Sequence, residues 1–426
     1  MRILLAIDHY PPIIGGAQIQ SMVLAKSLHE RGHEVVVATV WQRGVPAIEM
    51  DDGFPVYRLR QLRTLPGIAR GWRHHQPPFP DPVTVVGLRR LITRIQPDIV
   101  HSYGWFSYSC AAALLGKRIP LVLTARDYAY SCATRTLLYE GRACAGPALT
   151  KCLGCAGREY GRPKGWITTF AVLGCAPLLR RKVRAVHSIS SYVQTIMRRD
   201  FIDDRDSTAE TLGPVIHATI HDVIADVNDQ PHRRPAAGDL DLARLEELPR
   251  EPFILFVGGL RRVKGLEQLF AAYEKLTAPP PLVLIGTLER DSPEFPPGIR
   301  VLTNFPHRAV MAAWERCLFA ALPSLLSEPF GTVVCEAMSR GKAVIGTVPG
   351  GHADMIVHGE SGLLVPAGDV PALADAMQQL IADGALRERL GKAARVRAQV
   401  FTIERSIPRI ERLYERLVPP SARTAS

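Results

Sequence analysis

The chain has 426 residues, 47% of them hydrophobic and 22% charged, which is typical of a globular protein and excludes an intrinsically disordered chain. Its formal net charge is +11, but residues 1–215 hold 28 Lys and Arg against 16 Asp and Glu, so the basic excess lies wholly in the first half. No apolar run of about 18 residues is present, so the sequence predicts no membrane-spanning helix.

Short apolar strands alternate with amphipathic helices along the first half. This alternation is typical of parallel βαβ units. The start of the chain is too short and too quickly polar for a signal peptide, so we read it as a buried strand and expect a cytoplasmic protein. The predicted strands are 3–7, 34–40, 97–102 and 121–124, and the predicted helices are 17–31 and 84–95.

Arginines are densest between positions 58 and 94, where Asp81 is the single acid. A solvated basic surface is one interpretation of this stretch. The other is a face that meets an anionic partner, either acidic lipid headgroups or a phosphate-bearing acceptor. No nucleic-acid-binding motif accompanies the charge, so we do not expect a nucleic-acid partner.

Four cysteines fall within 24 residues and end in a Cys-x2-Cys pair, in a segment that its glycines and Pro147 predict to be a loop. Such a pair matches half of many structural zinc sites. Structural zinc, unmodified thiols and disulfides stay open as alternatives. The candidate ligands are Cys132, Cys144, Cys152 and Cys155.

An apolar run over residues 167–179 is followed by Arg180, Arg181 and Lys182. It predicts a helix, with two interpretations of its role. The helix packs on the first domain, or it lies on a membrane surface with its basic end at the headgroups. The second interpretation would suit a lipid-linked acceptor.

The second half repeats the strand–helix alternation after a polar connection over residues 203–252. The sequence therefore predicts an α/β protein with two doubly wound, Rossmann-like domains that face each other across a cleft. We place the domains at 1–215 and 216–402. Predicted strands are 253–257, 282–285, 300–302, 319–323, 343–346 and 362–365, and predicted helices are 370–383, 385–399 and 403–417.

In each half, a glycine-rich turn follows the first predicted strand. Gly15 and Gly16 would let a ligand approach the backbone closely at the start of the next helix. Their spacing is not that of a dinucleotide-binding fingerprint. In the second half, Gly258 and Gly259 precede Arg261, Arg262 and Lys264, and these cations suit a diphosphate leaving group.

Two carboxylates stand eight positions apart in the most informative segment of the chain. Pro329 and Gly331 disfavour one continuous helix, which places Glu328 in a loop and Glu336 in the first turns of a new helix. The N-terminus of that helix offers backbone N–H groups to a phosphate. A surface helix with two solvated acids is the alternative interpretation.

These motifs together resemble the family 4 retaining glycosyltransferases of the GT-B fold along nearly the whole chain. The resemblance implies retaining sugar transfer from a nucleotide-diphosphate sugar, with no cofactor or divalent metal required for catalysis. It also implies an acceptor-binding first domain, to which helix 403–417 crosses back. The matching segments are Gly15-Gly16, residues 97–101, Val257-Gly258-Gly259 with Lys264-Gly265, Glu328 to Gly331 with Glu336, and residues 350–366.

The resemblance also implies roles for individual residues. Glu336 would hold the ribose hydroxyls, Glu328 the hydroxyls of the donor sugar, and Lys264 the diphosphate, while Gly16 would close on the diphosphate from the first domain. Backbone amides of three further residues would contact the donor: Phe330, Gly331 and Thr332.

Two positions depart from the family pattern. Gly259 stands where many members have Arg, and Arg261 or Arg262 could replace that cation. Arg126 stands where many members have the His of a His-Asp pair, so it could meet an anionic donor sugar or acidic acceptor, or could pair with Asp127 without a catalytic role.

Retention could proceed through a covalent carboxylate intermediate or by front-face attack with the leaving phosphate accepting the acceptor's proton. We favour front-face attack, because most members of the family that this chain resembles lack a well-placed nucleophile. We expect a role in glycolipid, cell-surface polysaccharide or glycoconjugate synthesis, with a peripheral position at the inner membrane face as one alternative. The alternatives are a nucleotide-sugar epimerase or hydrolase on the same fold, and a non-catalytic carbohydrate- or membrane-binding protein.

Overall fold

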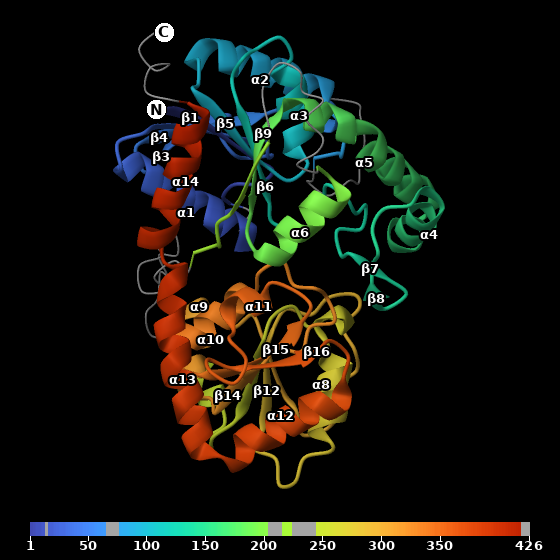
Figure 1. Ribbon diagram of the computed structural model, residues 1–426, viewed down its shortest axis with the longest axis vertical. Helices are drawn as coiled ribbons and strands as arrows, with labels where there is room; N and C mark the ends of the chain where they lie inside the picture. Colours follow the sequence, from blue (N-terminus) through green and yellow to red (C-terminus); the bar gives the residue numbers. More distant parts are fainter. Residues whose placement is uncertain (13–15, 65–75, 203–214, 224–243, 419–426) are drawn as a thin grey trace. The chain divides into compact units, whose positions relative to one another are not determined.

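The computed structural model describes residues 1–12, 16–64, 76–202, 215–223 and 244–418. The chain forms two compact units (Figure 1). The first contains residues 1–137, 144–221 and the segment from Glu404, and the second contains residues 138–143 and 222–403. Gly15 and much of the predicted connection over 203–252 lie outside the described residues.

The described part of the first unit contains an eight-stranded sheet in the order β10-β9-β6-β5-β1-β2-β4-β3. Neighbouring strands are parallel except β3 and β4, which are antiparallel. Apolar runs form these strands, and Ile3, Leu4 and Leu5 of β1 are fully buried. The bounds are β1 Arg2–Ile7, β2 Glu34–Val40, β3 Ile48–Asp51, β4 Phe54–Leu59, β5 Ile99–Tyr103, β6 Leu121–Ala125, β9 Val183–Ser188 and β10 Ile216–Thr219.

Helices connect these strands (Figure 1). Local sequence fixes several helix starts; for example, Asp81 caps α2 by accepting a 2.9 Å hydrogen bond from the Thr84 N–H, and Pro82 follows it. The bounds are α1 Gly16–Glu30, α2 Pro82–Ile95, α3 Phe106–Ala113, α4 Leu149–Tyr160, α5 Arg162–Lys182, α6 Ser191–Asp200 and α14 Ile403–Leu417, with a 3₁₀ turn η1 at Leu62–Thr64.

The C-terminal helix α14 packs on the first unit. Its buried Tyr414 hydroxyl lies 2.6 Å from Nδ1 of His101, which belongs to β5. Glu411, one turn earlier, forms an ion pair with Arg31 at 2.7 Å, and its Oε1 lies 3.0 Å from Nε2 of His33. These contacts join residues more than 300 positions apart within one unit.

The second unit has a parallel sheet that, among its described residues, has the order β13-β12-β11-β14-β15-β16. A small antiparallel hairpin of β7 and β8 is grouped with this unit. The bounds are β7 Leu138–Tyr139, β8 Arg142–Ala143, β11 Ile254–Val257, β12 Leu282–Gly286, β13 Arg300–Thr303, β14 Phe319–Ala321, β15 Ala343–Val348 and β16 Leu363–Pro366.

The helices of the second unit flank this sheet (Figure 1). They are α8 Leu266–Tyr273, α9 His307–Arg316, α10 Thr332–Ser339, α11 His352–Met355, α12 Val370–Ala382 and α13 Gly384–Ala398. Short 3₁₀ turns are η2 at Arg244–Glu247, η3 at Arg262–Lys264 and η4 at Gln399–Phe401. Both units are therefore doubly wound α/β folds, and the predicted fold class is confirmed.

The order of strands reverses once near the middle of each sheet. In the first unit β1 pairs with β2 on one side and β5 on the other. In the second, β11 pairs with β12 on one side and β14 on the other. The loops that leave two such neighbouring strands diverge, and ligands of doubly wound sheets bind in the crevice between them.

The loop predicted around the cysteines is partly wrong. Cys152 and Cys155 lie on α4, which runs through Gly154 and Gly157. Close packing against α5 explains why a helix forms there: a Cβ on Gly165 would stand 2.3 Å from the Ala156 carbonyl oxygen, so the backbones of α4 and α5 are in close contact.

None of the helices in the described part of the chain is long and apolar enough to span a bilayer.

Candidate functional site

Lys264 and Glu328 come together at the reversal of strand order in the second unit. Lys264 ends η3, in the loop after β11, and Glu328 lies in the loop after β14. The ammonium Nζ of Lys264 donates a 2.7 Å hydrogen bond to Oε1 of Glu328. The Ser324 hydroxyl donates a second 2.7 Å hydrogen bond to the same oxygen.

Backbone contacts hold these two loops against each other. The Val263 carbonyl oxygen accepts a 3.0 Å hydrogen bond from the Leu325 N–H. Gly265 has φ +77°, and a Cβ there would lie 1.8 Å from the Pro323 carbonyl oxygen, so only glycine fits. The Lys264–Glu328 pair therefore stands on a backbone that is fixed from both sides.

The Glu328 carboxylate is ionised in this environment. Burial by itself would raise the pKa of Glu328, but the charge of Lys264, the neighbouring His352 and the hydrogen bonds from Lys264 and Ser324 outweigh it. The pKa of Glu328 consequently lies below its ordinary value. An ionised carboxylate is an acceptor of hydrogen bonds, which is the chemistry needed to hold sugar hydroxyls.

His352 is a buried, neutral neighbour of this pair. Burial lowers its pKa to about 4, and Lys264 lowers it further while Glu328 opposes the shift. Its Nδ1 accepts a 3.1 Å hydrogen bond from the Thr347 N–H, so the ring proton belongs on Nε2. A Cβ on Gly331, where φ is +109°, would stand 2.9 Å from that Nε2.

The helix α10 begins directly after the Glu328 loop. Gly331 precedes it without a side-chain cap, so the first N–H groups of α10 have no capping side chain. Phe330 is buried, with its ring centroid 5.6 Å from that of Phe401, so its backbone is the part available to a ligand. Thr332 is the first helical residue.

Glu336 lies on α10 but does not join the Lys264–Glu328 pair. Its Oε1 lies 3.1 Å from Nε2 of His307, and its Oε2 accepts a 3.4 Å hydrogen bond from the Trp314 indole N–H. Both partners belong to α9. These contacts fix the rotamer of Glu336, while its remaining lone pairs can accept further hydrogen bonds.

The other predicted cations of the second unit are engaged in ion pairs. Arg261 Nε lies 3.0 Å from both carboxylate oxygens of Asp291, and the stem of Arg261 passes 3.8 Å from where a Cβ on Gly259 would lie. Arg262 pairs with Glu267. Replacement of the missing family cation by Arg261 or Arg262 would require these pairs to open.

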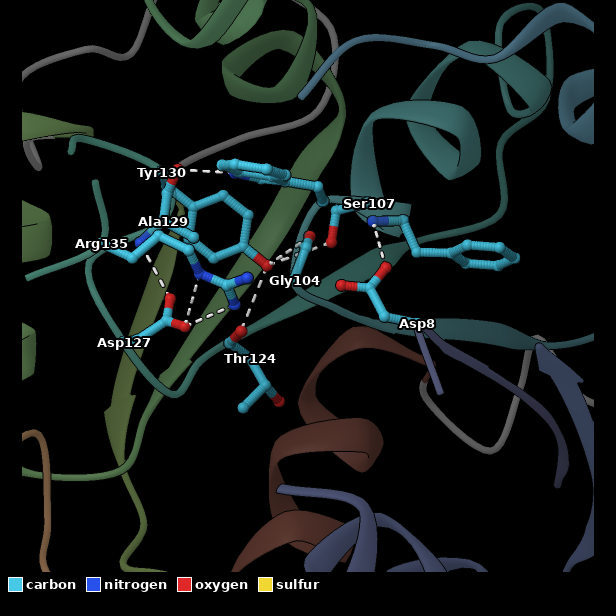
Figure 2. Close-up of polar contacts among 10 residues, drawn as sticks. Asp8, Gly104, Ser107, Thr124, Asp127, Ala129, Tyr130 and Arg135 are labelled. Atoms are coloured by element: carbon cyan, nitrogen blue, oxygen red, sulfur yellow. Dashed lines mark hydrogen bonds and ion pairs between the residues drawn. The ribbon is translucent and has the colours of Figure 1, made fainter. Parts of the chain in front are cut away.

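In the first unit, Arg126 follows β6 and places its guanidinium 5.3 Å from the centroid of the Tyr103 ring. Its neighbour Asp127 pairs with Arg135 rather than with Arg126: Arg135 donates to Oδ2 of Asp127 through Nε at 3.0 Å and Nη2 at 2.5 Å (Figure 2). Arg135 is therefore the ion-pair partner that the structure gives to Asp127, and the role of Arg126 stays a prediction. Gly16 begins α1.

The four clustered cysteines carry free thiols. Within the described residues, no group of three or more His, Cys, Asp or Glu side chains could hold a metal ion. Cys132 Sγ lies 3.3 Å from the Thr134 hydroxyl, and Cys144 Sγ donates to the Gly146 carbonyl oxygen at 3.4 Å. Zinc binding stays a prediction for Cys132, Cys144, Cys152 and Cys155.

Sequence reasoning missed several residues around these carboxylates. Ser324 and His352 adjoin Glu328, and His307 and Trp314 hold Glu336. His352 had a signal, because it directly follows the Gly350-Gly351 pair of a recognised motif. His307 and Trp314 had none, since their contacts depend on how α9 packs against α10.

Two family models match the chain in tandem. "Glycosyl transferase 4-like domain" covers residues 15–208, and "Glycosyl transferases group 1" covers residues 241–397. Among curated proteins, N-acetyl-alpha-D-glucosaminyl L-malate synthase of Bacillus anthracis is 24% identical over 97% of each chain. D-inositol 3-phosphate glycosyltransferase of Pseudarthrobacter chlorophenolicus is 32% identical, over 39% of this chain and 45% of that one.

Solved structures share the fold. Sucrose-phosphate synthase from Thermosynechococcus elongatus superposes with a TM-score of 0.69 at 20% identity, covering 98% of this chain and 99% of the other. Alr3699/HepE of Anabaena, solved in complex with UDP, has a TM-score of 0.66 at 18% identity, covering 98% of this chain and 100% of the other. The chain is a glycosyltransferase of the group 1 family, with the two Rossmann-like units of the GT-B fold.

Proposed function

We propose that this enzyme transfers a sugar, with retention of anomeric configuration and without a divalent metal, from a nucleotide-diphosphate sugar to an acceptor hydroxyl. The observation that carries the proposal is the Lys264–Glu328 hydrogen bond at the strand-order reversal of the second unit, directly before the uncapped start of α10. Anabaena HepE, a fold neighbour, was solved with UDP and with UDP-glucose, which supports a nucleotide-sugar donor here.

Lys264 and the N-terminus of α10 would bind the diphosphate. The donor's anomeric carbon develops oxocarbenium character as its bond to the phosphate oxygen breaks, and negative charge grows on the departing diphosphate. A fixed ammonium and a helix N-terminus stabilise that charge. The acceptor hydroxyl then attacks from the face that the leaving group vacates, and its proton passes to the departing phosphate oxygen.

Glu328 and Glu336 would position the donor rather than react with it. Glu328, ionised beside Lys264, accepts hydrogen bonds from hydroxyls of the donor sugar, and Glu336 accepts them from the ribose. Gly16, Gly259 and the backbone of Phe330, Gly331 and Thr332 would approach the diphosphate. Such positioning raises the rate by holding the reacting atoms in place before the bond breaks.

The test is a transfer assay with UDP-, GDP- and ADP-sugars against a panel of hydroxylated acceptors, with L-malate, D-inositol 3-phosphate and octyl β-D-glucoside among them. Proton NMR of the first product reports the anomeric configuration, and EDTA reports metal dependence. An α-configured product from an α-configured donor, with full activity in EDTA, is expected. An inverted product, epimerised donor without transfer, or loss of activity in EDTA would contradict the respective part of the proposal.

We also propose that the enzyme works at an anionic membrane surface through α5, where it glycosylates an acceptor in glycolipid or cell-surface polysaccharide synthesis. The outer face of α5 carries Trp166, Ile167 and Phe170, whose exposed fractions are 47%, 53% and 56%. Beside these residues the buried face carries Gly165, Thr168 and Thr169, and further along the helix Val172, Ala176 and Leu179 are buried. Solvent-facing helix surfaces are ordinarily polar, so three large exposed apolar side chains at one end of this helix are unusual.

The charges of α5 match a bilayer that bears anionic lipids. The helix contains no Asp or Glu, and its five basic residues lie at its two ends. A surface helix of this kind buries its aromatic groups at the boundary of headgroups and acyl chains, while the basic residues contact phosphates. A cytoplasmic location at the inner membrane face would follow.

A further inference from the structure

Asp8 lies at the strand-order reversal of the first unit, in the loop after β1, which corresponds to the loop after β11 that carries Lys264 in the second unit. It directly follows β1, and Gly104 directly follows the neighbouring strand β5. This is the edge of a doubly wound sheet where ligands bind. No role for this edge follows from the Lys264–Glu328 site, which belongs to the other unit.

The Asp8 carboxylate is held from one side by backbone. Its Oδ1 accepts a 3.0 Å hydrogen bond from the Phe106 N–H at the start of α3 (Figure 2). Gly104 has φ +58°, and a Cβ there would stand 2.3 Å from Oδ2 of Asp8. The Tyr130 hydroxyl fixes this glycine by donating a 3.0 Å hydrogen bond to its carbonyl oxygen. A side chain at position 104 would therefore clash with the Asp8 carboxylate.

The neighbouring carboxylate, Asp127, differs from Asp8 in its partners. Asp127 accepts hydrogen bonds from the Ala129 N–H at 2.8 Å and from Arg135 twice (Figure 2). Arg135 is itself fixed over the Trp105 ring, 5.2 Å from its centroid. In the described part of the chain, Asp8 receives backbone N–H groups alone and no side-chain donor. Asp8 as a whole residue is half-buried.

We propose that Asp8 binds the acceptor, by accepting a hydrogen bond from one of its hydroxyl groups. This inference rests on the proposed sugar transfer, since it assigns the acceptor's contact for that reaction. A hydroxyl fits better than an anion, because a carboxylate with backbone N–H groups on one side presents only acceptor lone pairs on the other. Proton transfer is not assigned to Asp8, since the departing phosphate takes the proton.

The charged state of Asp8 supports this role. Burial raises the pKa of Asp8 to about 7, with Asp127 adding to the rise and Arg135 and the Phe106 and Trp105 N–H groups opposing it. The other groups in electrostatic reach are Arg63, which stays charged, and Cys110 and Tyr130, whose pKa values are raised by burial so that they stay neutral. Asp8 thus titrates near neutrality, where it is an acceptor of hydrogen bonds above pH 7 and protonated below.

The test compares Asp8→Asn with wild type, since Asn keeps an oxygen for the Phe106 N–H. Each enzyme is assayed for UDP-glucose hydrolysis, in which water is the acceptor, and for transfer to L-malate, D-inositol 3-phosphate and octyl β-D-glucoside. We expect hydrolysis within about twofold of wild type and an acceptor KM raised about tenfold or more, as loss of a hydrogen bond to a charged group predicts. The wild-type acceptor KM should rise as pH falls through 7, and that rise should be absent in the variant.

A second measurement separates this role from a structural one and needs no acceptor. Because folding raises the pKa of Asp8, its ionised form destabilises the folded state above the unfolded value of 3.8. Asp8→Asn should therefore melt at the same or a higher temperature than wild type at pH 8. A lower melting temperature, or transfer kinetics equal to wild type, would overturn the proposal. Glu30→Gln, which removes an exposed acid of α1, is the matched control.

If wild type neither binds nor hydrolyses nucleotide sugars, the proposed function itself fails. If both enzymes hydrolyse UDP-glucose and transfer equally, only the role of Asp8 fails. The two results are therefore distinguishable.

Discussion

The ammonium of Lys264 lies 2.7 Å from the carboxylate of Glu328, although 64 residues separate them in sequence. Each residue follows one of the two strands between which the order of the second sheet reverses. Lys264 therefore supplies a cation suited to bind a diphosphate, and Glu328 supplies a carboxylate suited to accept hydrogen bonds from sugar hydroxyls. In the free enzyme each neutralises the other, so a bound donor would find both groups already oriented.

Lys264→Ala should lower turnover by about a hundredfold or more, since loss of one electrostatic contact to the leaving group typically costs roughly 3–4 kcal/mol of barrier. The fold should persist, because Lys264 is at the end of a short surface turn. Steady-state kinetics with the preferred donor measure the effect. Lys275→Ala removes an exposed lysine of the same unit and serves as control. Turnover of Lys264→Ala within threefold of wild type would refute the role.

Glu336→Gln should weaken donor binding through the ribose. We expect the donor KM to rise about tenfold or more, since the lost hydrogen bond involves a charged group. The sharper measurement is a cycle with UDP-glucose and 2′-deoxy-UDP-glucose: the variant should discriminate less between them than wild type does. Full additivity of the two changes would rule out contact between Glu336 and the 2′-hydroxyl. Glu315→Gln on α9 is the control.

His187 should make the protein less stable in acid. It is buried in β9 and donates from Nε2 to the Ile220 carbonyl oxygen at 2.8 Å. Burial, aided by Arg126, His221 and Arg409, lowers the pKa of His187 to about 4, although the bond to Ile220 opposes this. The unfolded chain therefore binds a proton that the folded chain does not, and stability falls as pH drops from 6.5 toward 4.

The expected loss from His187 is roughly 2–3 kcal/mol between pH 7.5 and 4.5. Urea unfolding at the two pH values measures it, and His187→Gln should lose less stability than wild type over the same interval. An equal loss in both proteins would contradict the assignment. His358→Gln, at an exposed histidine of the second unit, controls for the substitution.

Substitution of both Trp166 and Phe170 by serine should abolish binding to vesicles of phosphatidylglycerol and phosphatidylcholine. Each large side chain is expected to contribute about tenfold or more to the partition, since its full burial is worth roughly 1.5–3 kcal/mol. Co-sedimentation measures binding, and Leu288→Ser, at an exposed apolar residue of the second unit, is the control. Self-association that the double substitution abolishes, with no vesicle binding by wild type, would assign the α5 face to a dimer instead.

Metal analysis of protein purified without chelator tests the predicted zinc. Bound zinc should fall when Cys132 and Cys155 are replaced by serine and should persist in Cys175→Ser. Less than about 0.2 zinc per chain in wild type would end the prediction. The thiols would then serve as small apolar groups where α4 packs.

The sequence predicted those strands of each sheet that are continuous apolar runs, because strands covered on both faces need no alternation. It did not reveal β3, whose exposed Ile48 and Met50 give no core signal, since this strand lies at the sheet edge. It also placed Cys152 and Cys155 in a loop, because glycine counts against a helix unless close packing, as between α4 and α5, requires it.

Some residues of the candidate site could likewise be predicted from the sequence, and others could not. Lys264 and Glu328 were predictable because each stands in a loop motif with its own glycine or proline signature. His307 and Asp8 were not, because their positions depend on contacts between elements distant in sequence. A lone polar residue after a strand has no local signal that distinguishes a ligand contact from a solvated side chain.

The central claim is that the second unit binds an activated sugar through Lys264 and Glu328. Isothermal titration of wild type, Lys264→Ala and Glu328→Gln with UDP-, GDP- and ADP-sugars tests it most directly. We expect one of these donors to bind wild type saturably below millimolar concentration and to bind both variants at least about tenfold more weakly. Absence of binding to wild type at millimolar donor, or equal affinity in all three proteins, would contradict the claim.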